Sequence, residues 1–562
     1  MTQPNPSTAI ARTLADELHR HGVDYAVISP GSRSAALAIA FDEHPAIATR
    51  VILDERSASF HALGRARATQ APVVALCTSG TALANYLPAV VEADLALVPL
   101  ILISADRPPD MLHVGANQTI DQNRIFGERT RWFCNLPPPE PSQDGNAYWR
   151  TTVSQAVARA LGHGGRPGPV HLNVAFREPT VPVGDDGRSK ALSYPHSIEG
   201  RPDRARWQDH QRARPGPGRL PDLEGERGLL VVGEGDFDPM ELASAAERLG
   251  WPVLGTALSG LRGTEVITTY HHLLVEGVPP ALRPSHVVTV GRIGPSDRLA
   301  QLSGLPIPHI HIDPWGSWND PRRDSTLLLE ADPATTLDSV GRPMDGRFRE
   351  TWVEADATMR SALDQRLAEI ETATGPSVAR SLGTLEFDLL VAASSMPVRD
   401  VDAHTIHKAR TIANRGASGI DGFVSTAMGA ASGGRRTLAL AGDLSLLHDA
   451  GGFVTDERGD VVYLVIDNGG GGLFDLLPQA EHAPGFDRLF VTPHGLDLAR
   501  VAEAYGLGVS VVDRLDGLAS TVTGRLAEGG PQVVVVPVDR ETDLKQRRGL
   551  DDVARLVCAG FS

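Results

Sequence analysis

Short apolar runs alternate with longer segments of helical periodicity along most of this chain. Runs that are rich in Val, Ile, Leu and Ala and that end abruptly in polar residues are typical of buried parallel strands. In the first third of the chain, the predicted strands are Tyr25–Ser29, Val51–Leu53, Val73–Cys77, Pro99–Ser104 and Val170–Val174. The helices predicted among them are Ala35–Asp42, Ser57–Thr69, Ala82–Ala93 and Ala147–Leu161. This alternation predicts a doubly wound parallel sheet.

The same alternation recurs twice further along the chain. The second set of predicted strands comprises Gly228–Val232, Val253–Leu254, His286–Val290 and His309–Ile312, and the third includes Thr437–Ala441, Val461–Ile466 and Val533–Val538. The sequence therefore predicts an α/β protein with three doubly wound parallel-sheet domains. We expect these domains at residues 1–185, 221–350 and 351–562, joined by a connector at 186–220. The connector is rich in Arg, Pro and Gly, and its basic charge is more typical of a solvated face than of a binding site.

Composition narrows the class of protein. The net charge of −16 disfavours non-specific nucleic-acid binding, so we expect no nucleic-acid partner. The three cysteines, Cys77, Cys134 and Cys558, form no CxxC pair, which favours a reducing cytoplasm. The amino terminus lacks the apolar core of a secretory signal. No apolar run approaches the roughly 20 residues that span a bilayer, so we expect no membrane association.

The segment from Thr437 to Pro478 carries the most specific chemistry. Asp443 follows the first predicted strand of this segment and Asn468 follows the second, after a spacing that accommodates one crossover helix. A right-handed crossover brings both strand ends to the same edge of the sheet, where open α/β sheets bind ligands. Carboxylate, amide and backbone oxygens are the ligands that Mg²⁺ prefers. Gly469–Gly472 allows close backbone approach to an anion, and Phe474–Leu477 is predicted to begin a helix whose amino end favours negative charge.

These features predict a Mg²⁺–diphosphate site, with an ordinary Gly-rich turn as the alternative. Gly442-Asp443 followed by Asn468 resembles the diphosphate-binding signature of thiamine diphosphate (ThDP) enzymes. That family usually has two asparagines at the second position, whereas this chain has Asp467-Asn468, so we expect Asn468 to be the ligand. The resemblance implies ThDP with Mg²⁺ or Mn²⁺, the metal being held by Asp443, Asn468 and Gly470. The further cofactor contacts that it implies are Gly442, Leu444, Ser445, Gly471, Leu473 and Phe474.

An acidic pair, Asp54-Glu55, stands where the second predicted strand meets a helix. Acids at a helix amino end are favoured by the helix dipole, which is the structural alternative for this pair. In ThDP enzymes a glutamate in this place hydrogen-bonds to the cofactor pyrimidine and promotes the imino tautomer that activates the thiazolium. The resemblance assigns that role to Glu55, in a pyrimidine-binding first domain, and the diphosphate to the third domain. It also implies a homodimer or a dimer of dimers, because the two domains that hold one cofactor come from two subunits.

A further set of residues resembles the 2-succinyl-5-enolpyruvyl-6-hydroxy-3-cyclohexene-1-carboxylate synthase family of ThDP enzymes. These residues lie in SPGSRSAAL, SADRPPD, GANQTIDQ, SSMPVRD and NRGASGIDG. The substrate-binding positions that the resemblance implies are Ser32, Arg33, Arg107, Asn117, Gln118, Arg298, Ser395, Arg399 and Arg415, and Ile420 is the apolar support that bends the cofactor. Each arginine has a buried ion pair as its alternative, and Ile420 has core packing. Asp297 departs from the basic residue often found before the position of Arg298.

The implied reaction is decarboxylation of 2-oxoglutarate and 1,4-addition of its succinyl carbon to isochorismate, in menaquinone biosynthesis. Several arginines at strand ends agree with this reaction, because both substrates carry two carboxylates. One rival is another ThDP decarboxylase or carboligase, such as an acetolactate synthase. Another is a non-catalytic α/β nucleotide-binding protein, against which the presence of Glu55, Asp443 and Asn468 argues. The GxG of VVGEGDFDP lacks the full dinucleotide fingerprint, so we expect a structural middle domain.

Overall fold

The computed structural model describes residues 4–182, 193–221, 223, 227–262, 266–340, 346–456 and 458–562. By its internal contacts the chain divides into two compact units. Unit 1 consists of Met1–Arg212, Asn414–Arg435 and Ser445–Val461, and unit 2 of Ala213–Ala413, Arg436–Leu444 and Val462–Ser562. The three-domain boundaries expected from the sequence stay a prediction.

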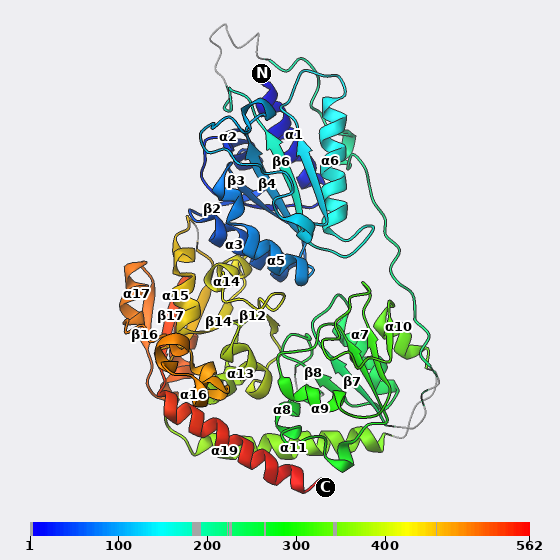
Figure 1. Ribbon diagram of the computed structural model, residues 1–562, viewed down its shortest axis with the longest axis vertical. Coiled ribbons are helices and arrows are strands. Elements are labelled where there is room, and N and C mark those ends of the chain that lie inside the picture. Colours follow the sequence, from blue (N-terminus) through cyan, green and yellow to red (C-terminus); the bar gives the residue numbers. More distant parts are fainter. Residues whose placement is uncertain are drawn as a thin grey trace. The chain divides into compact units, whose positions relative to one another are not determined.

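Unit 1 contains a six-stranded parallel sheet in the order β2-β1-β3-β4-β6-β5 (Figure 1). Its core has two layers, one packed on α1, α2 and α6 and the other on α3 and α5. The strands are β1 (Tyr25–Ile28), β2 (Ala48–Val51), β3 (Val73–Cys77), β4 (Leu100–Asp106), β5 (Trp132–Leu136) and β6 (Val170–Ala175). The helices are α1 (Pro6–Arg20), α2 (Ala35–Asp42), α3 (Glu55–Thr69), α4 (Thr81–Ala84), α5 (Leu87–Leu95), α6 (Gly145–Ala160) and α14 (Phe423–Ala431).

Helices α3 and α14 pack with their backbones in close contact. A Cβ at Gly64 would lie 2.0 Å from the carbonyl oxygen of Thr426, and a Cβ at Gly429 would lie 2.0 Å from that of His61. Both positions therefore require glycine, because any larger residue would push the helices apart. This contact joins a late segment of the chain to the helix that begins at Glu55.

Unit 2 contains two further parallel sheets, in the orders β11-β10-β9-β7-β8 and β13-β12-β14-β15-β17-β16. The last order repeats that of the sheet in unit 1. The first of these sheets has strands β7 (Gly228–Val232), β8 (Val253–Gly255), β9 (His286–Val290), β10 (His309–Ile312) and β11 (Leu327–Leu329). The second has β12 (Leu389–Ala392), β13 (Arg410–Ile412), β14 (Thr437–Gly442), β15 (Val461–Asp467), β16 (Gly508–Val511) and β17 (Pro531–Pro537). Three parallel sheets with intervening helices confirm the predicted fold class.

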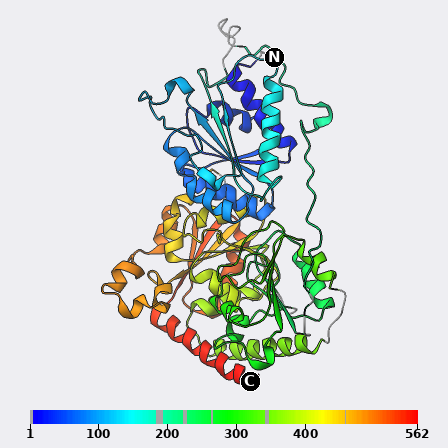
Figure 2. The ribbon, with the colours of Figure 1, turned by 45° about the vertical axis from the view of Figure 1, so that its right-hand side comes forward.

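Two long helices of unit 2, α11 (Arg347–Ala368) and α19 (Arg540–Ala559), lie side by side and bury Trp352 and Leu550 in one core (Figures 1 and 2). A short helix, α15 (Asp443–His448), follows β14; its first two residues belong to unit 2 and the rest to unit 1. The other helices of unit 2 are α7 (Pro239–Arg248), α8 (Tyr270–Leu273), α9 (Ala300–Ser303), α10 (Pro333–Asp338), α12 (Gly375–Ser381), α13 (Met396–His404), α16 (Gln479–His482), α17 (Leu498–Ala504) and α18 (Leu518–Glu528). Among the described residues, no helix combines the length and apolarity needed to cross a membrane.

Three predicted elements differ from those observed. The strand expected at Val51–Leu53 is β2, which ends at Val51, and Leu53 is 67% exposed in the bend before α3. The helix expected at Ala82–Ala93 is interrupted between α4 and α5, and α5 begins at Leu87 with Pro88 in its first turn. The helix expected to begin at Phe474 is a 3₁₀ turn over Gly472–Leu476, because successive glycines favour a tight turn over a regular helix.

Candidate active site

The candidate metal-binding end of the site lies in unit 2, where β14 and β15 end side by side. Asp443 is the first residue of α15 and is only 2% exposed. Its Oδ2 accepts a hydrogen bond from the Gly470 amide at 2.7 Å, and its Oδ1 accepts one from the Leu444 amide at 2.6 Å. Burial raises the pKa of Asp443, and the neighbouring charge of Asp467 raises it further. A divalent cation would compensate both carboxylates, so the residues fit one.

The turn after β15 depends on glycine. Gly470 has φ of +149°, and a Cβ there would lie 2.3 Å from the carbonyl oxygen of Val491. Gly471 donates its amide to the same carbonyl at 2.7 Å. A Cβ at Gly472 would lie 2.4 Å from Nδ2 of Asn468, so this turn holds the predicted amide ligand close to its backbone. The structure therefore brings Asp443, Asn468 and Gly470 to one strand edge, as the sequence predicts.

Sequence reasoning missed two groups beside Asp443. Nε2 of His494 lies 3.5 Å from Oδ2 of Asp443 and 3.9 Å from Oδ1 of Asp467. Ligand atoms of these three residues all lie within 4.8 Å of one another. Asp467 stood out in the sequence only as a departure from the usual asparagine, and no spacing signal pointed to His494. The predominance of oxygen donors suits Mg²⁺, which prefers hard oxygen ligands.

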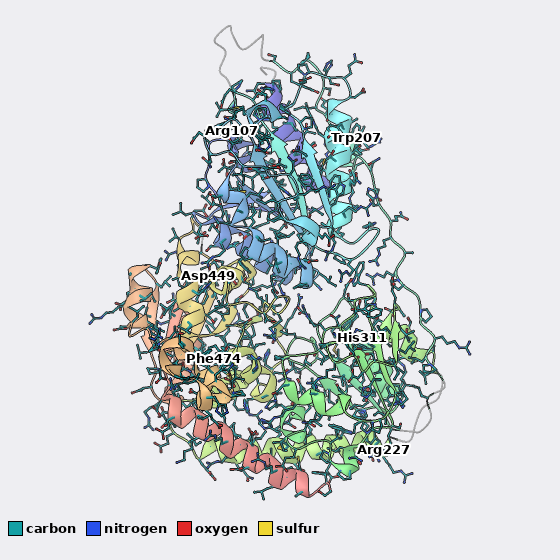
Figure 3. All side chains as sticks on the ribbon, viewed as in Figure 1. Arg107, Trp207, Arg227, His311, Asp449 and Phe474 are labelled. Atoms are coloured by element: carbon teal, nitrogen blue, oxygen red, sulfur yellow. The ribbon has the colours of Figure 1, made fainter. Side chains whose placement is uncertain are left out.

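The predicted apolar wall is half-buried in the same region. Leu473 and Phe474 belong to the 3₁₀ turn after the glycines, and the ring of Phe474 lies 5.6 Å from that of Phe490 (Phe474 is labelled in Figure 3). Leu444 and Ser445 follow Asp443 in the first turn of α15. A Cβ at Gly442, the last residue of β14, would meet no atom within 4 Å, so space is open beside it.

Glu55 is the first residue of α3 in unit 1. Asp54, not Glu55, caps this helix, because Oδ1 of Asp54 accepts the Ser57 amide at 3.2 Å. The helix-dipole alternative for Glu55 stays open, because Glu55 lies in the first turn of this helix. Glu55 is half-buried, and burial raises its pKa. A carboxyl group with a raised pKa is suited to share a proton with a ligand nitrogen.

Arg33, Arg107 and Gln118 gather at the carboxyl ends of β1, β3 and β4 (Arg107 is labelled in Figure 3). Arg107 donates to the Asn117 carbonyl at 3.0 Å, and Gln118 donates to the Ser79 carbonyl at 2.9 Å. Burial and the charge of Arg33 both lower the pKa of Arg107. Arg33 also pairs with the exposed Glu178, whose Oε1 lies 3.2 Å from Nη1 of Arg33, so the ion-pair alternative applies to this arginine. Ser32, beside this group, is exposed.

Arg415 and Ile420 lie on a loop of unit 1 that leads into α14. Its backbone is held by Glu92 of α5, whose Oε1 accepts the Gly416 amide at 2.7 Å and whose Oε2 accepts the Ala417 amide at 2.6 Å. Ile420 is 37% exposed, so it is not a core residue of the single chain. Sequence reasoning missed Glu92 because nothing local distinguishes it from any surface glutamate.

The other predicted residues lie in unit 2. Arg399 donates to the Ser395 carbonyl at 2.6 Å, and Ser395 has φ of 76° just after β12, next to β14. Arg298 instead makes two 2.8 Å contacts with the Asp551 carboxylate. That pairing is an ion pair between two part-buried side chains, and a substrate contact by Arg298 stays a prediction.

Comparison with known proteins agrees with this arrangement. Residues 8–125 match the model of the thiamine pyrophosphate enzyme N-terminal TPP binding domain, and residues 400–536 match that of the C-terminal TPP binding domain. The chain is 41% identical to a 2-succinyl-5-enolpyruvyl-6-hydroxy-3-cyclohexene-1-carboxylate synthase of Thermobifida fusca, over 98% of this chain and 99% of the relative. The chain belongs to this family of thiamine pyrophosphate enzymes. A relative with the same name in Rubrobacter xylanophilus is 40% identical, over 97% of this chain and 98% of the relative. Another in Halobacterium salinarum is 36% identical, over 98% of this chain and 99% of the relative.

Both domain matches contain residues that the sequence analysis predicted to bind the cofactor. The N-terminal match contains Glu55, and the C-terminal match contains Asp443 and Asn468. The relatives also span the central sheet, which neither domain model covers. The ThDP cofactor predicted from the sequence is thus confirmed, whereas the roles of individual residues stay predictions.

Proposed function

We propose that this protein catalyses the ThDP- and Mg²⁺-dependent decarboxylation of 2-oxoglutarate and the 1,4-addition of the succinyl carbon to isochorismate. The products are CO₂ and 2-succinyl-5-enolpyruvyl-6-hydroxy-3-cyclohexene-1-carboxylate, an intermediate of menaquinone biosynthesis. The observation that carries this proposal is 41% identity, over almost the whole of both chains, to a relative that is named for this product.

The arginines support the choice of substrates. Arg33 and Arg107 lie close enough at one strand edge of unit 1 for the charge of Arg33 to lower the pKa of Arg107, while Arg399 follows β12 in unit 2. Guanidinium groups bind carboxylates through paired hydrogen bonds, and each proposed substrate is a dicarboxylate. An acetolactate synthase-like enzyme acts on substrates with fewer carboxylates and has less need of such a set.

The residues at the cofactor have distinct tasks. Asp443, Asn468 and the backbone of Gly470 would hold Mg²⁺ on the diphosphate, and Mn²⁺ has the same ligand preference. When bound, ThDP supplies the electron sink for decarboxylation. Glu55 would hold the proton that it shares with the pyrimidine, and its raised pKa suits this task. Leu473 and Phe474 would exclude water from the reacting carbon, and Ile420 would be the apolar support that bends the cofactor.

A homodimer, or a dimer of dimers, is part of the proposal. Apolar side chains surround the strand end that leads into Glu55: Val51, Leu53 and Val454 are 41%, 67% and 44% exposed. Ile52 and Thr455 form a backbone bridge that holds these side chains in one region. Large apolar side chains gathered in this way are typical of a face that another subunit covers. We also propose a cytoplasmic location, in keeping with three unpaired cysteines.

The decisive test is an assay of 2-oxoglutarate consumption with ThDP and Mg²⁺, with and without isochorismate, followed by mass analysis of the products. Formation of the succinylated cyclohexene adduct only when isochorismate is present would support the proposal. Consumption of 2-oxoglutarate without that adduct would indicate a different ThDP decarboxylase. Size measurement by light scattering would test the dimer, and a monomer that is active at all concentrations would contradict it.

A further inference from the structure

Asp449 is a fully buried carboxylate that joins three segments of unit 1 (labelled in Figure 3). Its Oδ1 accepts a hydrogen bond from Oγ of Ser57 at 3.1 Å, and its Oδ2 accepts one from the Ser425 amide at 2.7 Å. Ser57 lies in the first turn of α3, and Ser425 lies in the first turn of α14. A buried charge is costly unless donors satisfy it, so Asp449 holds these two helix ends firmly together.

Arg56 adds a second connection to the same segment. Its Nη2 donates to the His448 carbonyl at 2.9 Å and lies 3.8 Å from Oδ1 of Asp449. The two residues that directly follow Glu55 are therefore both fixed to the His448–Asp449 pair. Because the direction of a side chain in the first turn of a helix depends on the backbone of that turn, these contacts restrict where the Glu55 carboxyl group can point.

We propose that Asp449 is a positioning residue for Glu55, and this inference rests on the proposed function of Glu55. Asp449 touches neither cofactor nor substrate in this proposal. It acts through Ser57 and Arg56 by fixing the first turn of α3.

The test compares two serines on α3. Ser57→Ala removes the hydroxyl that donates to Asp449, whereas Ser59→Ala removes an equally buried hydroxyl that donates only to the Arg56 carbonyl, at 2.8 Å. The main readout is the rate at which the C2 proton of bound ThDP exchanges with deuterium, measured by NMR after acid quenching. We expect Ser57→Ala to slow this exchange roughly tenfold, because small misplacements of a catalytic group have effects of that size or larger. We expect Ser57→Ala and Ser59→Ala to change the ThDP affinity by the same amount and the melting temperature by the same amount.

Two further variants separate positioning from folding. Asp449→Asn can still accept the Ser425 amide and donate to Ser57, so it should restore most of the exchange rate that Asp449→Ala loses. In the protein without cofactor, hydrogen–deuterium exchange of the peptide over residues 54–60 should be faster in Ser57→Ala than in Ser59→Ala. Equal C2-proton exchange rates in the two serine variants would overturn the inference.

A separate variant tests the proposed role of Glu55 itself. Glu55→Gln should keep ThDP binding and lose most C2-proton exchange. If Glu55→Gln exchanges normally, the role proposed for Glu55 is wrong. If Glu55→Gln is impaired while the two serine variants behave alike, only the positioning role of Asp449 is wrong.

Discussion

Glu92 and Gly416 are joined across 324 residues by a 2.7 Å hydrogen bond from the Gly416 amide to the Glu92 carboxylate. The second carboxylate oxygen accepts the Ala417 amide, and Arg67 lies 3.3 Å away as the charge partner. The side chains of Glu92 and Arg67 are each only 3% exposed. A buried ion pair thus anchors the loop that carries Arg415 and Ile420.

Replacing Glu92 with Gln should destabilise the protein by about 3 kcal/mol, because it removes the buried charge beside Arg67 and turns one acceptor into a donor. A fall in melting temperature by calorimetry is the measurement. Glu43→Gln is the matched control, since Glu43 pairs with Arg12 through side chains that are 52% and 45% exposed. That control should change stability by less than about 1 kcal/mol. Equal losses in the two variants would contradict the anchoring role.

Asp443→Ala should abolish Mg²⁺-dependent ThDP binding, as measured by titration calorimetry. In the unaltered protein, EDTA should have the same effect. Since burial raises the pKa of Asp443 and protonation removes the charge that attracts the metal, Mg²⁺-dependent affinity should weaken as the pH falls toward that pKa. Asp487→Ala, which changes a 69% exposed acid of the same unit, serves as the control. Unchanged binding by Asp443→Ala would remove the metal-site assignment.

Two glycines of the metal-binding edge should respond differently to alanine. Gly470→Ala introduces a Cβ 2.3 Å from a backbone carbonyl at φ of +149°, whereas Gly442→Ala meets no atom within 4 Å. We expect Gly470→Ala to lower stability by about 1–3 kcal/mol and Gly442→Ala to have little effect. Melting temperatures without cofactor or metal measure the difference directly. Similar melting temperatures would show that the turn relaxes to accept a side chain.

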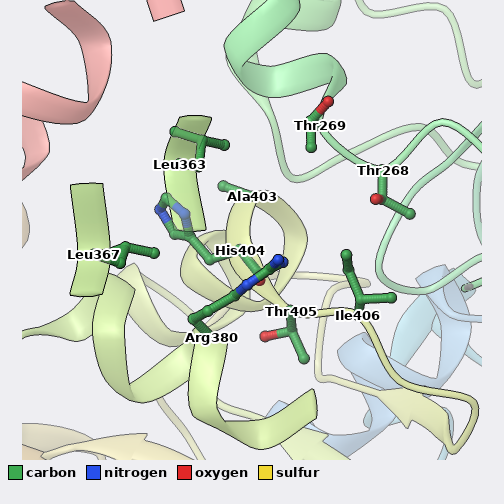
Figure 4. A pocket seen from close by; sticks show the side chains of 9 residues that line it. All are labelled: Thr268, Thr269, Leu363, Leu367, Arg380, Ala403, His404, Thr405 and Ile406. Carbon is green, nitrogen blue, oxygen red and sulfur yellow. The ribbon is translucent and has the colours of Figure 1, made fainter. Parts of the chain in front are cut away.

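His272 should make unit 2 sensitive to acid. Its two ring nitrogens have no hydrogen-bond partner among the described residues, and burial, assisted by Arg298, lowers its pKa to about 3. Its ring lies 5.0 Å from that of His404 and 5.2 Å from that of His271. His404 itself lines a cavity of about 10 Å³ beside Leu363 and Leu367 (Figure 4).

Between about pH 6.5 and 3 the unfolded chain binds a proton at this histidine and the folded chain does not. Stability therefore falls as the pH falls through this range, by up to about 1.4 kcal/mol per pH unit for one such group. His272→Phe keeps a ring and removes the titration, so its melting temperature should fall less steeply with acidification. His482→Phe, at a 77% exposed histidine, should leave the slope unchanged. Parallel slopes for all three proteins would contradict the prediction.

Buried strands were the predictable part of the fold, since β3 and the first four residues of β4 are continuous runs of buried apolar residues. The edge strands of the first sheet could not be predicted in the same way. β5 is largely half-exposed, and β2 is exposed or half-exposed throughout, so neither has a clear apolar period. The strand edge at which Asp443 and Asn468 meet was predictable, because these residues follow two consecutive buried strands.

The sequence analysis did not identify His494, Glu92 or Asp449, for a different reason. Each is an ordinary polar residue whose partner lies far away along the chain, and Asp449 is 392 residues from Ser57. Only the folded backbone shows that Glu92 and Asp449 are buried and which amides they accept. Sequence patterns of period two or 3.6 contain no information on such pairs.

The close packing of α3 against α14 has a consequence for biosynthesis. Arg65 donates to the carbonyl of Ser432, which is made 367 residues later. During synthesis, α3 therefore emerges from the ribosome long before α14 is made. Until then, the face of α3 that contains Gly64 is exposed to chaperones and to other nascent chains. Residues 1–212 expressed alone would keep that face permanently open, so the first unit is not a separable fragment even though most of it is contiguous.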